Sequence, residues 1–120
     1  MATITAQKII EDGLTESGST ISCNASGDEF VNSGIEFLKF KNTDATTYTV
    51  TVTAQTTAVK HQTYGKLTKS NITKTVAQNQ VMFMGPFKQS AFNDANGKVQ
   101  ITYSETPTAM TVGLFYLDPQ

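Results

Sequence analysis

The sequence predicts an all-β fold, a single antiparallel β-sandwich of about eight strands in a jelly-roll-like or immunoglobulin-like arrangement. Several segments alternate apolar and polar side chains with a period of two, as half-buried strands do. Turn signals recur at intervals of about ten residues, and no segment has the period of an amphipathic helix. Threonine, a β-branched residue that suits exposed strand faces, accounts for twenty of the 120 residues. Residues 1–120 are therefore expected to form one domain.

The first two strands are expected to be short. Residues 3–10 (TITAQKII) predict the first, and residues 1–12 are expected to serve as an edge strand or as an N-terminal arm. Residues 19–25 (STISCNA) predict the second, in which Cys23 is expected to be a small buried apolar residue. The carboxylate pairs Glu11–Asp12 and Asp28–Glu29 are expected in solvated turns.

The third expected strand, residues 34–42 (GIEFLKFKN), is apolar on both sides. Ile35 and Phe37 share one face, whereas Leu38 and Phe40 share the other. This pattern predicts a strand that crosses from one environment to another through a bulge.

The remaining strands alternate more regularly. Residues 46–54 (TTYTVTVTA) place Tyr48, Val50 and Val52 on a buried face, with threonines opposite them. The next expected strands are residues 71–77, 79–85 and 97–104. Residues 109–117 (AMTVGLFYL) become apolar on both faces toward the C-terminus, which predicts a central strand or one that a partner covers.

Residues 84–104 (MGPFKQSAFNDANGKVQITYS) predict a strand end, a pinned loop, a turn and a return strand. Gly85 and Pro86 end the preceding strand, because proline has no N–H for the ladder and glycine adopts dihedral angles that other residues avoid. Phe87 and Phe92 are expected to anchor the loop over the end of the core. The side chain of Asn93 or Asp94 is expected to hydrogen-bond the loop backbone, and Gly97 to adopt a positive φ in a tight turn.

The composition argues against several classes of protein. The net charge is −1 and the chain has no arginine, whereas nucleic-acid binding draws on clustered arginine and lysine. No segment reaches the ~20 apolar residues of a membrane span, and the N-terminus lacks the features of a signal peptide, so residence in a cytosol is expected. The single cysteine permits neither an internal disulfide nor a cysteine-based zinc site.

No residue pattern indicates catalysis, so we expect the chain not to be an enzyme and to bind neither a cofactor nor a metal. The only histidine, His61, has no acid or cysteine near it in the sequence, and a general base needs a partner within reach. Asp28 and Glu29 lack the alternating oxygen ligands of a calcium loop. No phosphate-binding glycine pattern occurs.

Four segments in a fixed order resemble a family of small all-β virion proteins from tailed bacteriophages. They are GDEFVNSGIEFLKFKN at 27–42, TVTVTA at 49–54, GPF and FND followed by GKVQITYS within 85–104, and MTVGLFYL at 110–117. The resemblance covers residues 27–117. Within this range the segment 54–75 is longer than the corresponding part of the family pattern and less similar to it. These motifs are structural rather than catalytic.

The resemblance implies an auxiliary head protein, of the decoration or cement type, that binds the outside of an assembled icosahedral shell. The implied partner is the major capsid protein of the same phage, and the implied arrangement is a homo-oligomer around a symmetry axis of the lattice. The implied location is the head surface of the virion, after synthesis in the cytoplasm of the bacterial host. The resemblance implies no cofactor, nucleic acid or membrane.

Two segments are candidate capsid contacts. The middle of the chain has five lysines and no acid, and we expect it to project as a hairpin toward acidic capsid subunits through Lys60, His61, Tyr64, Lys66, Lys69 and Lys74. Alternatively, the N-terminal arm adds a strand to an exposed edge of a neighbouring subunit through Ile4, Ile9 and Ile10. Each segment also has a simpler interpretation, as a solvated hairpin or an ordinary first strand.

Two other functions stay open. A structural protein of the phage tail, neck or fibres can use the same sandwich. A glycan-binding β-sandwich module is the alternative from another class. Because the chain has no tryptophan, a sugar-stacking platform would depend on tyrosine, and Tyr64 has the most exposed setting.

Overall fold

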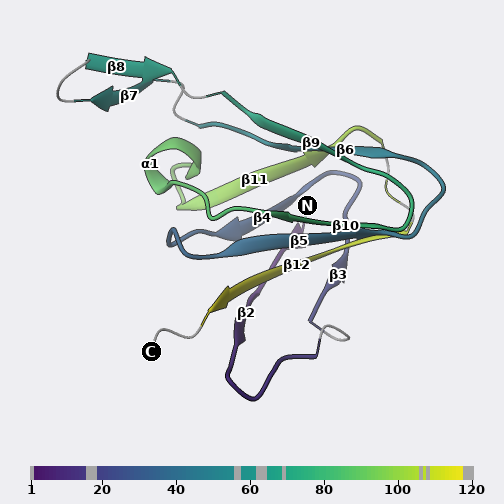
Figure 1. Cartoon of the computed structure of the whole chain (residues 1–120). Coiled ribbons are helices and arrows are strands. Elements are labelled where there is room, and N and C mark those ends of the chain that lie inside the picture. The colour runs from purple at the N-terminus through teal and green to yellow at the C-terminus, as the bar shows by residue number, and fades with distance from the viewer. Residues whose placement is uncertain are drawn as a thin grey trace.

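The computed structural model describes residues 2–15, 19–55, 58–61, 65–68, 70–105, 107 and 109–117, with the backbone alone at 58–61 and 65–68. This part of the chain folds as two β-sheets packed face to face (Figure 1), which confirms the predicted all-β sandwich. A two-stranded hairpin and one short helix complete it. Within the same residues, no helix is long and apolar enough to cross a membrane.

One sheet, sheet A, has the strand order β1-β4-β11-β6-β9. Its strands are β1 (Ala2–Thr3), β4 (Asp28–Val31), β11 (Lys98–Tyr103), β6 (Tyr48–Val52) and β9 (Ile72–Val76). Neighbouring strands are antiparallel except for β1, which is parallel to β4. Alternate residues of β6 are buried, as the alternation in the sequence predicted.

The second sheet, sheet B, has the order β10-β5-β12-β2, and β3 also pairs with β12. Its strands are β10 (Gln80–Met84), β5 (Phe37–Asn42), β12 (Met110–Leu117), β2 (Ala6–Ile9) and β3 (Ile21–Ser22). β12 is central, as its two apolar faces predicted. It is antiparallel to β5 and β3 but parallel to β2.

The strands pair in a nested order along the chain. β6 pairs with β9, β5 with β10, β4 with β11 and β3 with β12, and successive pairs alternate between the two sheets. This is the order of a long hairpin rolled into two sheets, so the structure follows the jelly-roll alternative. The connection between β6 and β9 contains the hairpin of β7 (Ala58–His61) and β8 (Gly65–Thr68), which pair only with each other and lie beyond the ends of β6 and β9 (Figure 1).

The core fills the space between the sheets. Both sheets contribute fully buried side chains, among them Phe30 of β4, Val50 of β6 and Phe40 of β5. The loop after β10, with the short helix α1 (Gln89–Phe92), closes one end of the sandwich. The rings of Phe87 and Phe92 pack edge to face there, with centroids 5.8 Å apart. The sequence pattern did not predict this single helical turn.

The N-terminal segment is divided between the two sheets instead of forming one strand. β1 lies at the edge of sheet A and β2 at the edge of sheet B. Between them Ile4 is buried in the core, and its backbone N–H donates to the carbonyl oxygen of Glu29 at 2.8 Å. Residues 2–9 thus supply an edge strand to each sheet of their own chain.

The bulge predicted within residues 34–42 is absent from the structure. β5 pairs with β10 and β12 without a break in register, so it has no bulge. Its two apolar faces instead belong to the core and to the surface, because Leu38 is buried whereas Phe37 points outward.

The solvated turn predicted at Asp28 and Glu29 is also wrong, since both residues lie in β4. Asp28 is buried there, and its Oδ2 accepts hydrogen bonds from the Tyr103 hydroxyl and the Asn24 backbone N–H. Cys23 nearby is buried, as predicted, and burial raises the pKa of its thiol to about 12.

Candidate interaction surface

The outer faces of the two sheets differ in chemistry. On sheet A, the outward side chains of β6 and β9 are threonines, with Thr51 opposite Thr73 and Thr49 opposite Thr75. On sheet B, three strands each place a phenylalanine outward: Phe83 in β10, Phe37 in β5 and Phe115 in β12. Successive side chains of a strand point to opposite faces of its sheet, so the residues between the buried ones form these two outer faces.

The three phenylalanines form a row across sheet B. The ring centroids of Phe37 and Phe83 are 6.3 Å apart, and those of Phe37 and Phe115 are 6.1 Å apart. Phe115 is covered, because its ring lies over Gly113, where an added Cβ would come within 2.6 Å of it. Phe83 is 62% exposed. The row therefore runs from a covered ring in the middle of the sheet to an open ring at its edge.

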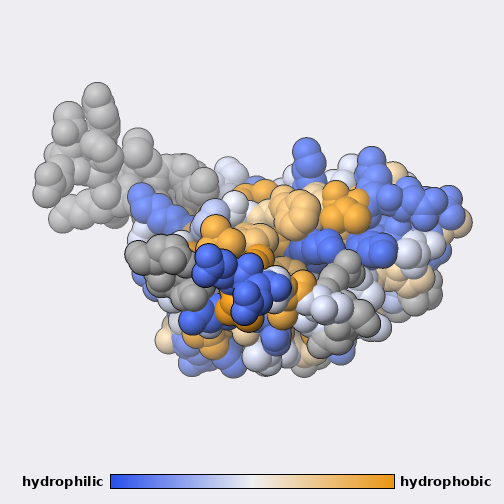
Figure 2. Space-filling model, turned by 60° about the horizontal axis from the view of Figure 1, so that its bottom comes forward, coloured by the Kyte–Doolittle hydropathy of each residue, from blue (hydrophilic) through white to orange (hydrophobic). Residues whose placement is uncertain are grey.

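Two hollows meet at Phe37. One of about 580 Å³ is lined by Gly34, Ile35, Phe37, Pro86 and Leu117. The other, of about 230 Å³, is lined by Ile9, Leu14, Phe37, Lys39, Phe83 and Phe115. Figure 2 views this side of the molecule and shows apolar side chains across its middle, with hydrophilic ones among and around them. We name as the apolar face the residues Ile9, Leu14, Ile35, Phe37, Val81, Phe83, Pro86 and Leu117.

Lysines interrupt this apolar face. Lys39 and Lys41 also point outward from β5, opposite Phe83 and Val81 of β10 respectively. Lys74 of β9 lines a third hollow, of about 270 Å³, together with Phe83 and Phe87. The surface on sheet B thus combines large apolar groups with positive charge, which suits a partner of apolar and acidic character.

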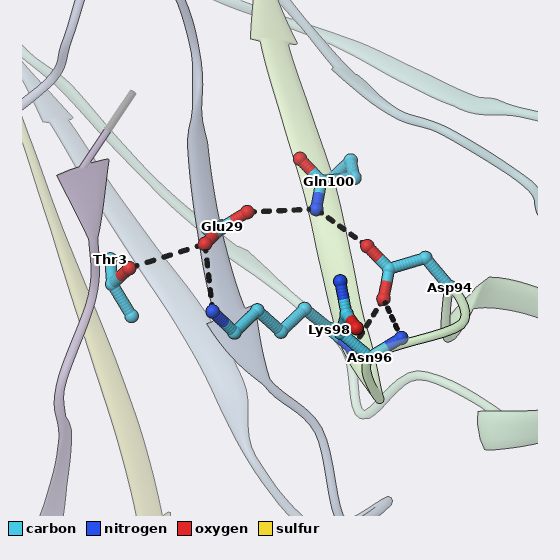
Figure 3. A network of polar contacts seen from close by, with 6 residues as sticks. All are labelled: Thr3, Glu29, Asp94, Asn96, Lys98 and Gln100. Carbon is cyan, nitrogen blue, oxygen red and sulfur yellow. Dashed lines mark hydrogen bonds and ion pairs between the residues drawn. The ribbon is translucent and has the colours of Figure 1, made fainter.

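The polar groups on the outside of sheet A largely bind one another (Figure 3). The Glu29 carboxylate accepts hydrogen bonds from Thr3, Lys98 and Gln100, and Lys98 Nζ lies 3.0 Å from Glu29 Oε2. The Gln100 amide also donates to Asp94 at 2.8 Å. These contacts join β1, β4 and β11 across the sheet.

Both carboxylates of this network are stabilised in the ionised form. The hydrogen bond from Gln100, followed by that from Lys98, lowers the pKa of Glu29 below its ordinary value of 4.5. The backbone N–H groups of Lys98 and Asn96 lower the pKa of Asp94. The network therefore supports the fold only while these groups carry their charge.

Stability is expected to fall in acid because of Glu29 and Asp94. A group whose folded pKa is depressed stabilises the protein fully above its unfolded pKa, and this contribution is lost as the pH falls through the folded pKa. We expect the midpoint of thermal unfolding, followed by circular dichroism, to decrease as the pH falls below about 4.5. Glu29→Gln, which cannot ionise, should show a shallower decrease. An identical pH profile for the variant and the wild type would contradict the prediction.

The predicted loop anchors lie together at the end of the core. Phe87 and Phe92 are buried, and the chain turns at Gly85, which has φ +111° and precedes Pro86 through a cis peptide bond. Asp94 Oδ1 accepts from the backbone N–H groups of Asn96 and Lys98, and Gly97 has φ +75°.

Asn93 forms an amide pair with Asn32 across the sandwich. Asn32 Nδ2 donates to Asn93 Oδ1 at 2.7 Å and to the Phe87 carbonyl at 3.1 Å, while Asn93 Nδ2 donates to the Asn32 carbonyl at 3.0 Å. Gln89 Nε2 also donates to the Asn32 carbonyl. Asn32 thus ties the end of β4 to the loop, a role that needs residues far apart in the sequence.

The structure describes only some of the predicted capsid contacts. Lys74 is exposed on β9, whereas the side chains of Lys60, His61 and Lys66, and the whole of Tyr64 and Lys69, lie outside what the structure describes. Of the N-terminal residues, Ile4 is buried, Ile9 lines a hollow of the apolar face and Ile10 is exposed. In the part of the chain that the structure describes, no three His, Cys, Asp or Glu side chains are grouped so as to hold a metal ion.

The most exposed members of the apolar face were not among the residues predicted as contacts. Ile35 is 54% and Phe83 62% exposed, whereas the sequence pattern predicts a bulge around Ile35 and an ordinary strand around Phe83. The available signal was the apolar character of both faces of residues 34–42 and 109–117. A strand that is apolar on both faces in a two-layer fold leaves one of those faces at the surface.

No family model matches the chain, and comparisons with curated proteins and with solved structures give no match. The apolar face and the roles of the motif residues are therefore the observations on which a function can be argued.

Proposed function

We propose that this chain is a structural protein of a tailed-phage virion that binds the outside of the assembled head and stabilises it. The observation that carries the proposal is the apolar face of sheet B, where Phe37 and Phe83 lie among three hollows of the surface. A contiguous exposed apolar surface rimmed by polar residues marks a protein contact site. The proposal thus assigns this chain a binding role and no catalytic step.

The motifs that resemble the phage family support the proposal through their structural roles. Gly27 allows the backbone of β11 to approach closely, and Asn32 and Asn93 join the loop to β4. Pro86, in the GPF segment, lines the larger hollow of the apolar face. The segments that carry the resemblance therefore hold the fold together and, at Phe37, Pro86 and Leu117, also line the surface to which we assign the binding.

The proposed partner is the major capsid protein of the same phage. Its contact surface would bury apolar side chains over Phe37 and Phe83 and place carboxylates near Lys39 and Lys41. A protein that binds only the assembled lattice adds its binding free energy to the stability of the shell. The chain would then reside on the head surface of the virion.

Cosedimentation with empty capsids that lack this protein tests the proposal directly. Purified chain, added across a concentration series, should bind until it reaches a ratio set by the lattice. Absence of binding would remove the head assignment and leave the tail, neck or fibre alternative, which the same assay with purified tails would examine. Saturable binding to a sugar, in place of capsids, would favour the glycan-binding alternative.

The double variant Phe37→Ser with Phe83→Ser should bind capsids at least about 100-fold more weakly, since buried aromatic anchors contribute about 2 kcal/mol or more each. The matched control is Val31→Ser, which replaces an apolar residue 59% exposed on the other sheet. Both variants should keep the circular dichroism spectrum of the wild type. Equal affinities of the double variant and the control would contradict the assignment of the apolar face.

The salt dependence of binding separates the apolar face from the lysine-rich hairpin. An apolar contact changes little with ionic strength, whereas a contact through exposed lysines weakens as salt screens their charge. We expect only a moderate salt dependence, from the charge pairs of Lys39 and Lys41, and little effect of Lys66→Glu with Lys69→Glu. Loss of binding in that variant, together with strong salt dependence, would move the contact to the hairpin.

A further inference from the structure

β10 is an open edge of sheet B. One side of its backbone pairs with β5, and no other strand of the described chain pairs with it. Its residues, Gln80–Met84 (QVMFM), include no charge, proline or glycine. An edge strand presents unpaired N–H and C=O groups, and proteins normally protect such edges with charged residues, prolines, bulges or short length.

The other edges of sheets A and B in the described residues are protected. β1 and β3 have two residues each, β2 contains Lys8 and β9 contains Lys74. β10 lacks these devices and also exposes Val81 and Phe83 beside its backbone. Among the edges of these two sheets it is therefore the one suited to pair with another strand.

We propose that β10 pairs antiparallel with β10 of a second copy of this chain, about a two-fold axis through Met82. The pairing joins the two copies of sheet B into one continuous sheet. The inference concerns the chain in solution and does not depend on the proposed binding to capsids.

The sequence of β10 matches itself in this register. A two-fold axis perpendicular to the sheet keeps outward side chains on the same side in both copies, and all five residues overlap only when Met82 faces Met82 of the second copy. Val81 then lies opposite Phe83 of the second copy, and this occurs twice. Pairs of aromatic and β-branched side chains are favourable across antiparallel strands, and no like charges meet along β10.

The dimer would place the two apolar faces in one plane. Phe83 lies beside the two-fold axis and Phe37 one strand further in, so the aromatic rows of both copies become continuous. If the proposed head binding holds, two faces held together bind a pair of symmetry-related sites with higher overall affinity than one face alone.

Sedimentation equilibrium of the purified chain without capsids tests the dimer. The mass should rise from 13.0 kDa toward twice that value as the concentration is raised. Val81→Glu with Phe83→Glu places like charges opposite each other in the dimer and should raise its dissociation constant at least about tenfold. Within each chain the new carboxylates face Lys41 and Lys39, so folding should be retained.

Two further variants isolate the register. Val81→Glu with Phe83→Lys puts opposite charges across the two-fold axis and should recover part of the lost affinity, since the new lysine also faces Lys39 of its own chain. Val31→Glu, which faces Lys98 on the other sheet, is the matched control and should dimerise like the wild type.

Disulfide trapping checks the register covalently. Directly opposite strand residues have Cα atoms about 5 Å apart, within the range that a disulfide spans. An oxidised equimolar mixture of Val81→Cys and Phe83→Cys should give a cross-linked heterodimer, whereas each variant alone should cross-link far less. Cys23 is buried and should not interfere.

A chain that stays monomeric at all concentrations would overturn the inference. So would a dimer that persists in Val81→Glu with Phe83→Glu, because another surface would then make the contact.

Discussion

Replacing Phe87 with alanine is expected to lower the free energy of unfolding by about 3–5 kcal/mol, the range for a buried phenylalanine. The ring is 2% exposed and packs between Phe30 and Phe92, with centroid distances of 5.9 and 5.8 Å. Its removal leaves a cavity that the loop cannot close, because the Phe87 carbonyl is held by Asn32. Urea denaturation followed by circular dichroism measures the loss.

Phe83→Ala is the matched control for this prediction. Phe83 lies four residues earlier, and its ring is mostly exposed, so we expect a cost below about 1 kcal/mol. For capsid binding the order should be reversed, since Phe83 is 62% exposed on the apolar face whereas Phe87 is only 2% exposed. Similar losses of stability in the two variants would show that Phe87 does not anchor the loop as its contacts indicate.

Replacing Gly27 with alanine should cost about 3 kcal/mol or more. Gly27 has φ +100°, a conformation that costs other residues about 1–3 kcal/mol. In addition, a Cβ at this position would lie 2.6 Å from the backbone oxygen of Ile101 in β11. Because a backbone oxygen cannot move without shifting its strand, overpacking adds about 1–3 kcal/mol. Thermal unfolding of the variant measures the combined cost.

Gly97→Ala separates these two contributions. Gly97 also has a positive φ, +75°, but a Cβ there would meet nothing within 4 Å. Its replacement should therefore carry only the conformational cost, about 1–2 kcal/mol. If Gly27→Ala and Gly97→Ala lower the unfolding midpoint equally, the close approach of β11 to Gly27 has no energetic consequence.

The strands with strict alternation were predicted correctly, because side chains along a strand point alternately to its two faces and apolar residues at every second position are therefore buried together. Tyr48, Val50 and Val52 are buried, and the threonines between them face outward. The turn at Gly97 and the anchors Phe87 and Phe92 were also found, since proline, glycine and large aromatic residues act within a few positions of one another.

The candidate site was only partly visible from the sequence. Apolar residues on both faces of 34–42 predict a bulge, because the pattern along one strand does not say whether a second layer covers each face. In the structure Leu38 meets the opposing sheet, whereas nothing in the described chain covers Phe37 completely. The short helix at 89–92 was missed for a similar reason, since one turn has no periodicity of its own.

Local chemistry along the chain thus specified the β class, most strand positions and the pinned loop, because these depend on neighbours within a few residues. The pairing of strands did not follow from it. The parallel pairs β1–β4 and β2–β12, the burial of Asp28 against Tyr103 and the open edge at β10 all join segments distant in sequence. Such contacts exist only once the nested sheets have formed, so their consequences, including which apolar face stays at the surface, were determined by the packing of the two layers.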